Sequence, residues 1–276
     1  MTFIIIFIFG LVVGSFLNAV IHRLHTGQSI VYDRSSCVHC HHKLSAIDLI
    51  PVVSFFALGG KCRYCRKPIS WQYPIVEIGT ATSFVLVYMS NAITLKAGIQ
   101  DWILGSLQFG GQASPRMTNL AEIIFQLIFV SFLIVIFVYD LKHYLILDKV
   151  VFLAAGLALV YQTWQGNVQN ALLGAGLLSG FFLLLYLVSK GRWIGFGDVK
   201  LGIFLGLLVP FPETIILFFL AYIIGAVVSV FLVSLKIRSM KDPVPFGTFL
   251  TFGAFIAMLW GRQLVEWYFR IIGFNL

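Results

Sequence analysis

The chain has 276 residues, of which 59% are hydrophobic and 11% charged, whereas ordinary soluble domains are about 45–50% apolar and about 25% charged. With a mean hydropathy of +0.95, this composition nearly excludes a soluble fold and predicts an all-α protein that crosses a membrane several times. Disordered, collagen-like and disulfide-scaffold proteins are also excluded. Apolar runs dominate, glycine has no period, and the four cysteines lie in one short stretch.

Eight apolar runs predict about eight transmembrane helices. In chain order they cover about residues 3–22, 74–93, 120–139, 148–164, 170–188, 199–211, 213–235 and 245–262. The sixth run is short for a span. It forms either a separate helix or a broken one with the seventh, across Pro210 and Pro212. Residues 94–119 contain a Gly-Gly pair and a proline and are predicted to form an external loop, with Trp102 at the membrane interface.

The runs divide the chain into three regions. Residues 1–22 form the first transmembrane helix, residues 23–73 a polar, cysteine-bearing cytoplasmic insert, and residues 74–276 the remaining transmembrane domain. The sequence shows no internal repeat and no low-complexity tract.

The basic residues indicate the orientation in the membrane. If residue 1 lies outside, the loops at 23–73, 140–149, 189–200 and 236–242 face the cytoplasm and hold all but four of the 19 lysines and arginines. The exceptions are Lys96, Arg116, Arg262 and Arg270. The positive-inside rule therefore predicts this orientation, with both ends external. A cleaved signal peptide is the disfavoured alternative, because the first run lacks a basic start and a small-x-small cleavage site.

The insert contains two Cys-x-x-Cys pairs, Cys37 with Cys40 and Cys62 with Cys65. Such pairs can supply four thiolates to a tetrahedral Zn²⁺, and a structural metal suits a segment too small for its own core. We therefore predict a structural zinc site. Two disulfides or four unrelated thiols are the alternatives, and a reducing cytoplasm disfavours disulfides. Three nearby histidines either replace a thiolate or lie in solvent. They are His39, His41 and His42.

The acidic residues give a second signal, because an ionisable group in or beside a membrane helix is a functional candidate. Asp198 follows Gly195 and Gly197 in a GxGD sequence directly before an apolar helix, and the glycines let another chain approach closely. Asp140 ends a strongly apolar run. Four acids lie at the predicted inner face. They are Asp140, Asp148, Asp198 and Asp242.

Asp140 and Asp198 suit the chemistry of an aspartyl protease. Two carboxylates brought together from different helices can share a proton, one acting as base on water and the other as acid toward a peptide carbonyl. Each also has a structural interpretation, since Asp140 could neutralise Lys142 or Lys149 and Asp198 could cap the helix that follows it. From these residues alone, both interpretations stay open.

Taken together, the motifs closely resemble those of the type IV prepilin peptidases, also called leader peptidases, over nearly the whole chain. Any one motif is weak, but the full set in order is highly specific. The matching segments are Gly14–Asn18 with Arg23-Leu24, the two cysteine pairs, Asp48–Pro51, Gly60–Arg63, Tyr73-Pro74 with Glu77, the segment ending at Asp140, Gly195–Leu201 and Pro245–Gly247.

The resemblance implies a membrane aspartyl endopeptidase of the GxGD type, with Asp140 and Asp198 as catalytic acids. Such enzymes remove the basic leader of pilin, pseudopilin or competence pilin precursors at the cytoplasmic face of a prokaryotic plasma membrane. Many also methylate the new N-terminus from S-adenosylmethionine, a function that the family places with the insert, and no residue here is identified for that donor. Expected partners are prepilin-like substrates and the bilayer, without nucleic acid. Gly195 and Gly197 are expected to shape a subsite for the leader's last residue, glycine in this family's substrates.

Two departures from the family's pattern lie close to the acids in sequence. Leu147 stands in place of the proline in Ile-Pro-Asp, and Thr248 in place of the last proline in Pro-Phe-Gly-Pro. Losing a proline relaxes φ, so these departures are expected to affect loop geometry more than activity.

Proteins of other classes are disfavoured by the sequence. Intramembrane serine and zinc proteases would need GxSG and HExxH, and the chain contains neither. The alternative is a non-enzymatic multispan transporter or zinc-responsive membrane protein. Inverted halves would favour it, and none is found.

Overall fold

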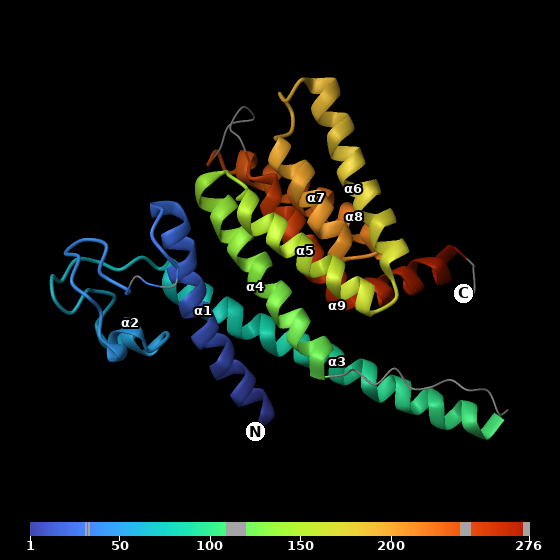
Figure 1. Ribbon diagram of the computed structural model, residues 1–276, viewed down its shortest axis with the longest axis horizontal. Helices are drawn as coiled ribbons and strands as arrows, with labels where there is room; N and C mark the ends of the chain where they lie inside the picture. The colour runs from blue at the N-terminus through green and yellow to red at the C-terminus, as the bar shows by residue number, and fades with distance from the viewer. Residues whose placement is uncertain (31, 33, 109–119, 238–243, 273–276) are drawn as a thin grey trace. The chain divides into compact units, whose positions relative to one another are not determined.

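The computed structural model describes the chain except residues 31, 33, 109–119, 238–243 and 273–276, and describes 93–108 and 272 by backbone only. Its described part is all-α, as predicted. The helices are α1 (Thr2–Thr26), the 3-10 helix η1 (Ala46–Leu49), α2 (Val53–Ala57), α3 (Gln72–Gln108), α4 (Leu120–His143), α5 (Asp148–Trp164), α6 (Val168–Ser189), α7 (Phe196–Leu208), α8 (Glu213–Ser234) and α9 (Phe246–Ile272) (Figure 1).

Within the described residues, six helices are long and apolar enough to cross a membrane: α1, α3 through Ala92, α4, α6, α8 and α9. This confirms a multi-pass membrane protein. Helices α5 and α7 occupy the predicted fourth and sixth positions but have only 17 and 13 residues, so the count of eight spans is approximate. Residues 209–212 separate α7 from α8, which resolves the sixth and seventh runs into two helices.

Helix α3 extends beyond its predicted end at residue 93. It continues to Gln108 because residues 94–108 contain no proline and are rich in helix-forming residues. The prediction of a loop is therefore wrong for residues 94–108, and their external position stays a prediction. Residues 109–119 of that loop lie outside the described residues.

By internal packing the chain forms two units, Met1–Val135 and Ile136–Leu276. In the first unit α1 packs closely on α3 because glycines of α1 meet the α3 backbone. A Cβ at Gly10 would lie 2.5 Å from Ala81 Cα, and one at Gly14 2.7 Å from Glu77 Cα. Small residues of this kind let membrane helices approach closely. The three functional regions predicted from sequence, 1–22, 23–73 and 74–276, stay a prediction.

In the second unit α7 is the central helix and packs against α5, α6 and α9 (Figure 1). Most of its residues from Val199 to Leu208 are buried. A Cβ at Gly206 would overlap the backbone of Ala175 in α6, and one at Gly202 would lie 3.2 Å from Ser179 Cα. This packing fixes the start of α7, and with it Asp198, inside the unit.

Candidate functional site

Asp140 lies in the last turn of α4 and is only 4% exposed. Its Oδ2 accepts a 2.9 Å hydrogen bond from the backbone N–H of Thr248. Thr248 belongs to the first turn of α9, whose N–H groups have no partner within their own helix. A carboxylate at this end of a helix also interacts favourably with the helix dipole. The contact therefore gives the buried acid a defined partner.

Asp198 lies in the first turn of α7, whose N-cap position is occupied by Gly195. Asp198 is therefore not the capping residue itself. Its carboxylate interacts electrostatically with Asp140, and the phenol of Tyr222 on α8 interacts electrostatically with Asp198. The fold thus brings the two acids singled out from sequence into one region of the second unit. Their catalytic role stays a prediction.

Ile146, between α4 and α5, packs against both glycine-bearing segments around the acids. A Cβ added at Gly197 would lie 3.1 Å from Ile146 Cβ, and one at Gly247 would lie 3.3 Å from Ile146 Cδ1. A Cβ at Gly195 has more room, with its nearest neighbour, Asp198 Oδ2, 3.8 Å away. Gly197 therefore permits close packing, while Gly195 leaves space beside the acid. The substrate subsite expected at these two glycines stays a prediction.

A cavity of about 230 Å³ opens between α8 and α9 in the same unit. Tyr222, Ala226 and Ser229 line it from α8, and Phe246 and Phe249 from α9. The rings of Tyr222 and Phe246 have centroids 5.1 Å apart. Tyr222, which interacts electrostatically with Asp198, is therefore the residue that links this mostly apolar cavity to the acids.

The other inner-face acids behave differently. Asp148 forms an exposed 2.7 Å ion pair with Lys200, which joins the starts of α5 and α7. Asp242 lies outside the described residues.

Sequence reasoning missed Thr248 and Tyr222 as neighbours of the acids. The departure at Thr248 was expected to affect loop geometry more than activity, whereas its N–H binds a proposed catalytic carboxylate directly. The altered family motif was the available signal. Nothing in the apolar sequence of α8 distinguishes Tyr222.

The four cysteines of the insert form a compact group. Their sulfur atoms all lie within 4.8 Å of one another, and those of Cys37 and Cys65 are 3.9 Å apart. Two thiolates on a tetrahedral ion would be separated by about 3.8 Å, given metal–sulfur bonds of about 2.3 Å. All four are free thiols rather than disulfides. The donor set and its spacing therefore fit a metal ion, and this group contains no described histidine.

The two cysteine pairs have the same backbone geometry. The Cys37 N–H donates to the His42 carbonyl oxygen at 3.0 Å, and the Cys62 N–H to the Lys67 carbonyl oxygen at 2.9 Å. In both turns the residue after the second cysteine has a positive φ, 57° in one and 59° in the other. The two turns therefore have the same backbone arrangement. Few residues besides the cysteines are shared.

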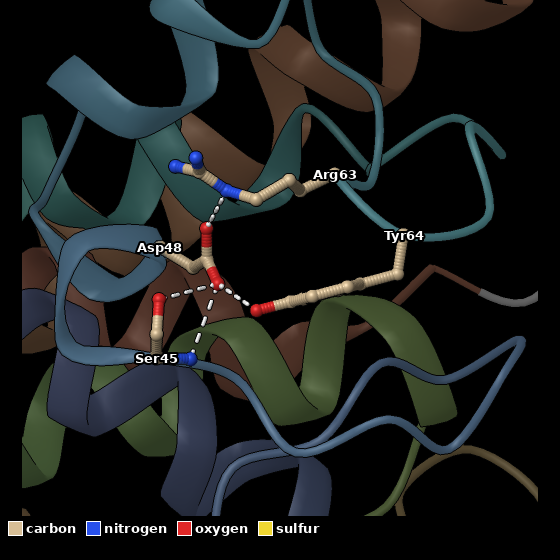
Figure 2. Close-up of polar contacts among 4 residues, drawn as sticks. All are labelled: Ser45, Asp48, Arg63 and Tyr64. Atoms are coloured by element: carbon tan, nitrogen blue, oxygen red, sulfur yellow. Dashed lines mark hydrogen bonds and ion pairs between the residues drawn. The ribbon is translucent and has the colours of Figure 1, made fainter.

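Asp48 of η1 ties the second pair to the segment between the pairs (Figure 2). Its carboxylate accepts hydrogen bonds from Arg63 Nε at 2.6 Å and the Tyr64 hydroxyl at 3.1 Å. The Ser45 hydroxyl and N–H donate to it at 2.8 and 3.1 Å. Burial raises the pKa of Asp48, but these hydrogen bonds outweigh it and lower the pKa to about 2. The carboxylate is therefore ionised at neutral pH.

Buried polar residues of α1 and α3 bind the middle of the insert and its C-terminal end. Glu77, 6% exposed, accepts a 2.7 Å hydrogen bond from the N–H of Val52, which precedes α2. Asn18 of α1 donates to the Tyr73 carbonyl oxygen at 3.1 Å and accepts from Gln72 Nε2 at 3.2 Å. Three of the motif residues, Asn18, Tyr73 and Glu77, thus join the insert to the helices.

Comparisons with known proteins agree with this architecture. A family model described as the Bacterial Peptidase A24 N-terminal domain matches residues 8–91, and that of the Type IV leader peptidase family matches residues 127–230. No solved structure matches the chain.

Several curated proteins are similar over nearly full length, each named prepilin leader peptidase/N-methyltransferase. The Aeromonas hydrophila protein is 30% identical, covering 96% of this chain and 93% of its own. The Pseudomonas aeruginosa protein is also 30% identical, with the same coverage of 96% and 93%. The Bacillus subtilis protein is 29% identical and covers 97% of this chain and 98% of its own.

Proposed function

Since the chain belongs to the family of prepilin leader peptidases/N-methyltransferases, we propose that it is a membrane-embedded aspartyl endopeptidase that removes the basic leader of prepilin-like precursors. The observation that carries the proposal is that Asp140 and Asp198 come from different helices of one unit and interact electrostatically. Its substrates are pilin, pseudopilin or competence pilin precursors.

The acid pair suits hydrolysis of a peptide bond because two interacting carboxylates hold a single proton more readily than none or two. The ionised carboxylate takes a proton from water, and the protonated one gives its proton to the carbonyl oxygen. Asp140 is buried whereas Asp198 is half-buried, which leaves one side of the pair open to a substrate.

The charge distribution favours an active site at the cytoplasmic face of a prokaryotic plasma membrane. The loops that follow α4 and precede α7, next to the two acids, belong to the basic set predicted to lie inside. A precursor would keep its leader in the cytoplasm and its apolar helix in the bilayer. The apolar cavity beside Tyr222 suits the first residues of that helix.

Selection of the scissile bond is steric in this proposal. The inner loops of the protein are basic. Because like charges repel, electrostatic attraction to these loops cannot select a basic leader. A subsite beside Gly195 and Gly197, where the flexible backbone lets the substrate lie close to Asp198, is instead proposed to accept only a leader that ends in glycine. The leader's charge orients the substrate through anionic lipid of the inner leaflet.

Zn²⁺ is the metal that suits the cysteine group. Four thiolates are a closed, tetrahedral donor set typical of structural zinc. Cys37, Cys40, Cys62 and Cys65 would hold the ion and organise the insert, without contact with the scissile bond.

Methyl transfer from S-adenosylmethionine to the new N-terminus is the second activity proposed, on the ground of the relatives' printed names. We assign no residue to this donor and derive no step through it.

One experiment tests both activities. Purified protein in detergent is incubated with a prepilin-like substrate, with and without S-adenosylmethionine. The mass of the product's N-terminal peptide is then measured by mass spectrometry. Loss of the leader supports the peptidase, and one added methyl group only with the donor supports the methyltransferase. An intact substrate contradicts the proposed peptidase.

A further inference from the structure

An apolar patch of the insert lies at its surface. Val53 and Phe56 of α2 are 62% and 59% exposed, and Trp71, the residue directly before α3, is 61% exposed. Val53 and Phe56 lie on the same side of α2 because they are three positions apart. The rings of Phe56 and Trp71 have centroids 6.2 Å apart. Neighbouring apolar side chains left exposed in this way indicate an interaction surface, and we call these three residues the α2 patch.

Helix α2 is held beside the first turns of α3. The N–H of Val52, directly before α2, donates to the Glu77 carboxylate at 2.7 Å. Glu77 is the sixth residue of α3, which places it roughly 8 Å along the helix axis from the first residue. The buried ring of Phe55 packs on the Trp71 ring with centroids 4.9 Å apart. The start of α2 is therefore level with the second turn of α3 and does not lie free of that helix.

The α2 patch continues onto an apolar face of a membrane helix. Helix α3 is apolar enough to cross the membrane from its first residue, Gln72. Ile75 and Ile78 are exposed on α3 and lie on one face, three positions apart. The Ile75 N–H donates to the Trp71 carbonyl oxygen at 3.2 Å, so Trp71 lies one turn before Ile75. Lipid is the apolar solvent available to these side chains.

The segment between α2 and α3 adds positive charge beside the patch. Residues 58–71 include four exposed basic residues and no acidic one. The basic residues are Lys61, Arg63, Arg66 and Lys67. Arg63 pairs with Asp48, whereas the other three form no ion pair with any described residue. In the predicted orientation these cations face the inner leaflet, whose anionic lipids attract lysine and arginine.

We propose that the α2 patch docks the insert on the bilayer, in the leaflet that the start of α3 enters. Val53, Phe56 and Trp71 lie among the upper acyl chains, and the basic residues contact anionic headgroups. Interfacial segments bury their apolar side chains to a depth of about 5–10 Å, which matches the level at which Glu77 holds α2. Tryptophan at the end of a spanning helix is typical of the membrane interface.

Docking keeps the cysteine-bearing insert at the membrane surface, although the sequence of the insert is polar overall. It does not depend on the proposed peptidase function, because Asp140 and Asp198 belong to the other unit.

Lipid quenching of a fluorescent label tests the proposal in the full-length protein. The protein is reconstituted in nanodiscs of phosphatidylcholine and phosphatidylglycerol, with an environment-sensitive fluorescent amino acid in place of Val53. The matched control carries the label in place of Val38, an exposed valine of the first cysteine turn outside the patch. Lipids brominated near the headgroup end of their acyl chains should quench the label at position 53 several-fold more strongly than the label at 38. Emission at position 53 should also be shifted to the blue.

A label in place of Phe56 gives a second measurement if the Val53 variant fails to fold, and it should be quenched like the label at 53. Equal quenching at the patch and at position 38 would overturn the proposal. A patch label that lipid does not quench, but whose emission changes when a prepilin-like substrate is added, would also overturn it. The patch would then bind the apolar helix of the substrate and not the bilayer.

Discussion

Gly247→Ala tests whether the acid pair needs the close approach of α9. A Cβ at this position would lie 2.8 Å from Asp140 Oδ2, 3.2 Å from its Cγ and 3.3 Å from Ile146 Cδ1. Carbon and oxygen atoms need about 3.4 Å for ordinary contact, so the Asp140 carboxylate would have to move by roughly 0.6 Å. That movement would also strain its hydrogen bond to Thr248.

Misplacement of a catalytic group by about 1 Å can cost about 100-fold in rate. We therefore expect Gly247→Ala to lower kcat for cleavage of a prepilin-like substrate by about 10- to 100-fold, with unchanged abundance in the membrane. Gly180→Ala is the matched control, because a Cβ there meets nothing within 4 Å, and it should cleave like the wild type. A wild-type kcat for Gly247→Ala would refute this packing of Gly247 on the acid.

Three further predictions concern the insert. Metal analysis of purified protein should find about one zinc per chain, and the Cys62→Ser/Cys65→Ser variant should lose it. Intact protein that is isolated without metal loss but contains no zinc would contradict the proposed site. Asp48→Ala should lower the local stability of the insert by about 1–3 kcal/mol and so make the insert more sensitive to proteolysis at neutral pH. The control variant Asp148→Ala should be digested like the wild type. Because the pKa of Asp48 is lowered to about 2, its hydrogen bonds stabilise the insert above about pH 4 and weaken as the pH falls toward 2. Equal digestion of Asp48→Ala and the wild type at neutral pH would contradict this role of Asp48. Glu77→Ala leaves the Val52 N–H without its acceptor and should speed amide hydrogen exchange in residues 52–57 relative to wild type, and unchanged exchange would speak against this anchor.

The helices could be predicted from the sequence because apolar runs determine where a chain can cross a bilayer. Helix α5 has the predicted bounds, and α8 begins at Glu213, as predicted. The end of α3 could not be placed, since helix-forming residues continue beyond the apolar run. The lengths of α5 and α7 were also unclear, because short apolar helices can pack inside a protein without spanning the membrane.

The acids could be identified from the sequence because ionisable residues are rare in apolar surroundings. The cysteines could be identified because their spacing is regular. The contact of Asp140 with Thr248 could not, because a backbone N–H leaves no mark in the sequence and 108 positions separate the two residues. The shared geometry of the two cysteine turns could not be predicted for a similar reason, since it consists of backbone hydrogen bonds and positive φ values.

The most direct test of the acid pair is cleavage of a prepilin-like substrate by three aspartate variants present in the membrane at equal levels. Asp140→Asn and Asp198→Asn should each nearly abolish cleavage, because an amide can neither hold nor pass the shared proton. Asp148→Asn should be much milder, because Asp148 forms only an exposed ion pair with Lys200. Substantial cleavage by either of the first two variants, or a collapse of activity only with Asp148→Asn, would contradict the assignment of Asp140 and Asp198 as the catalytic pair.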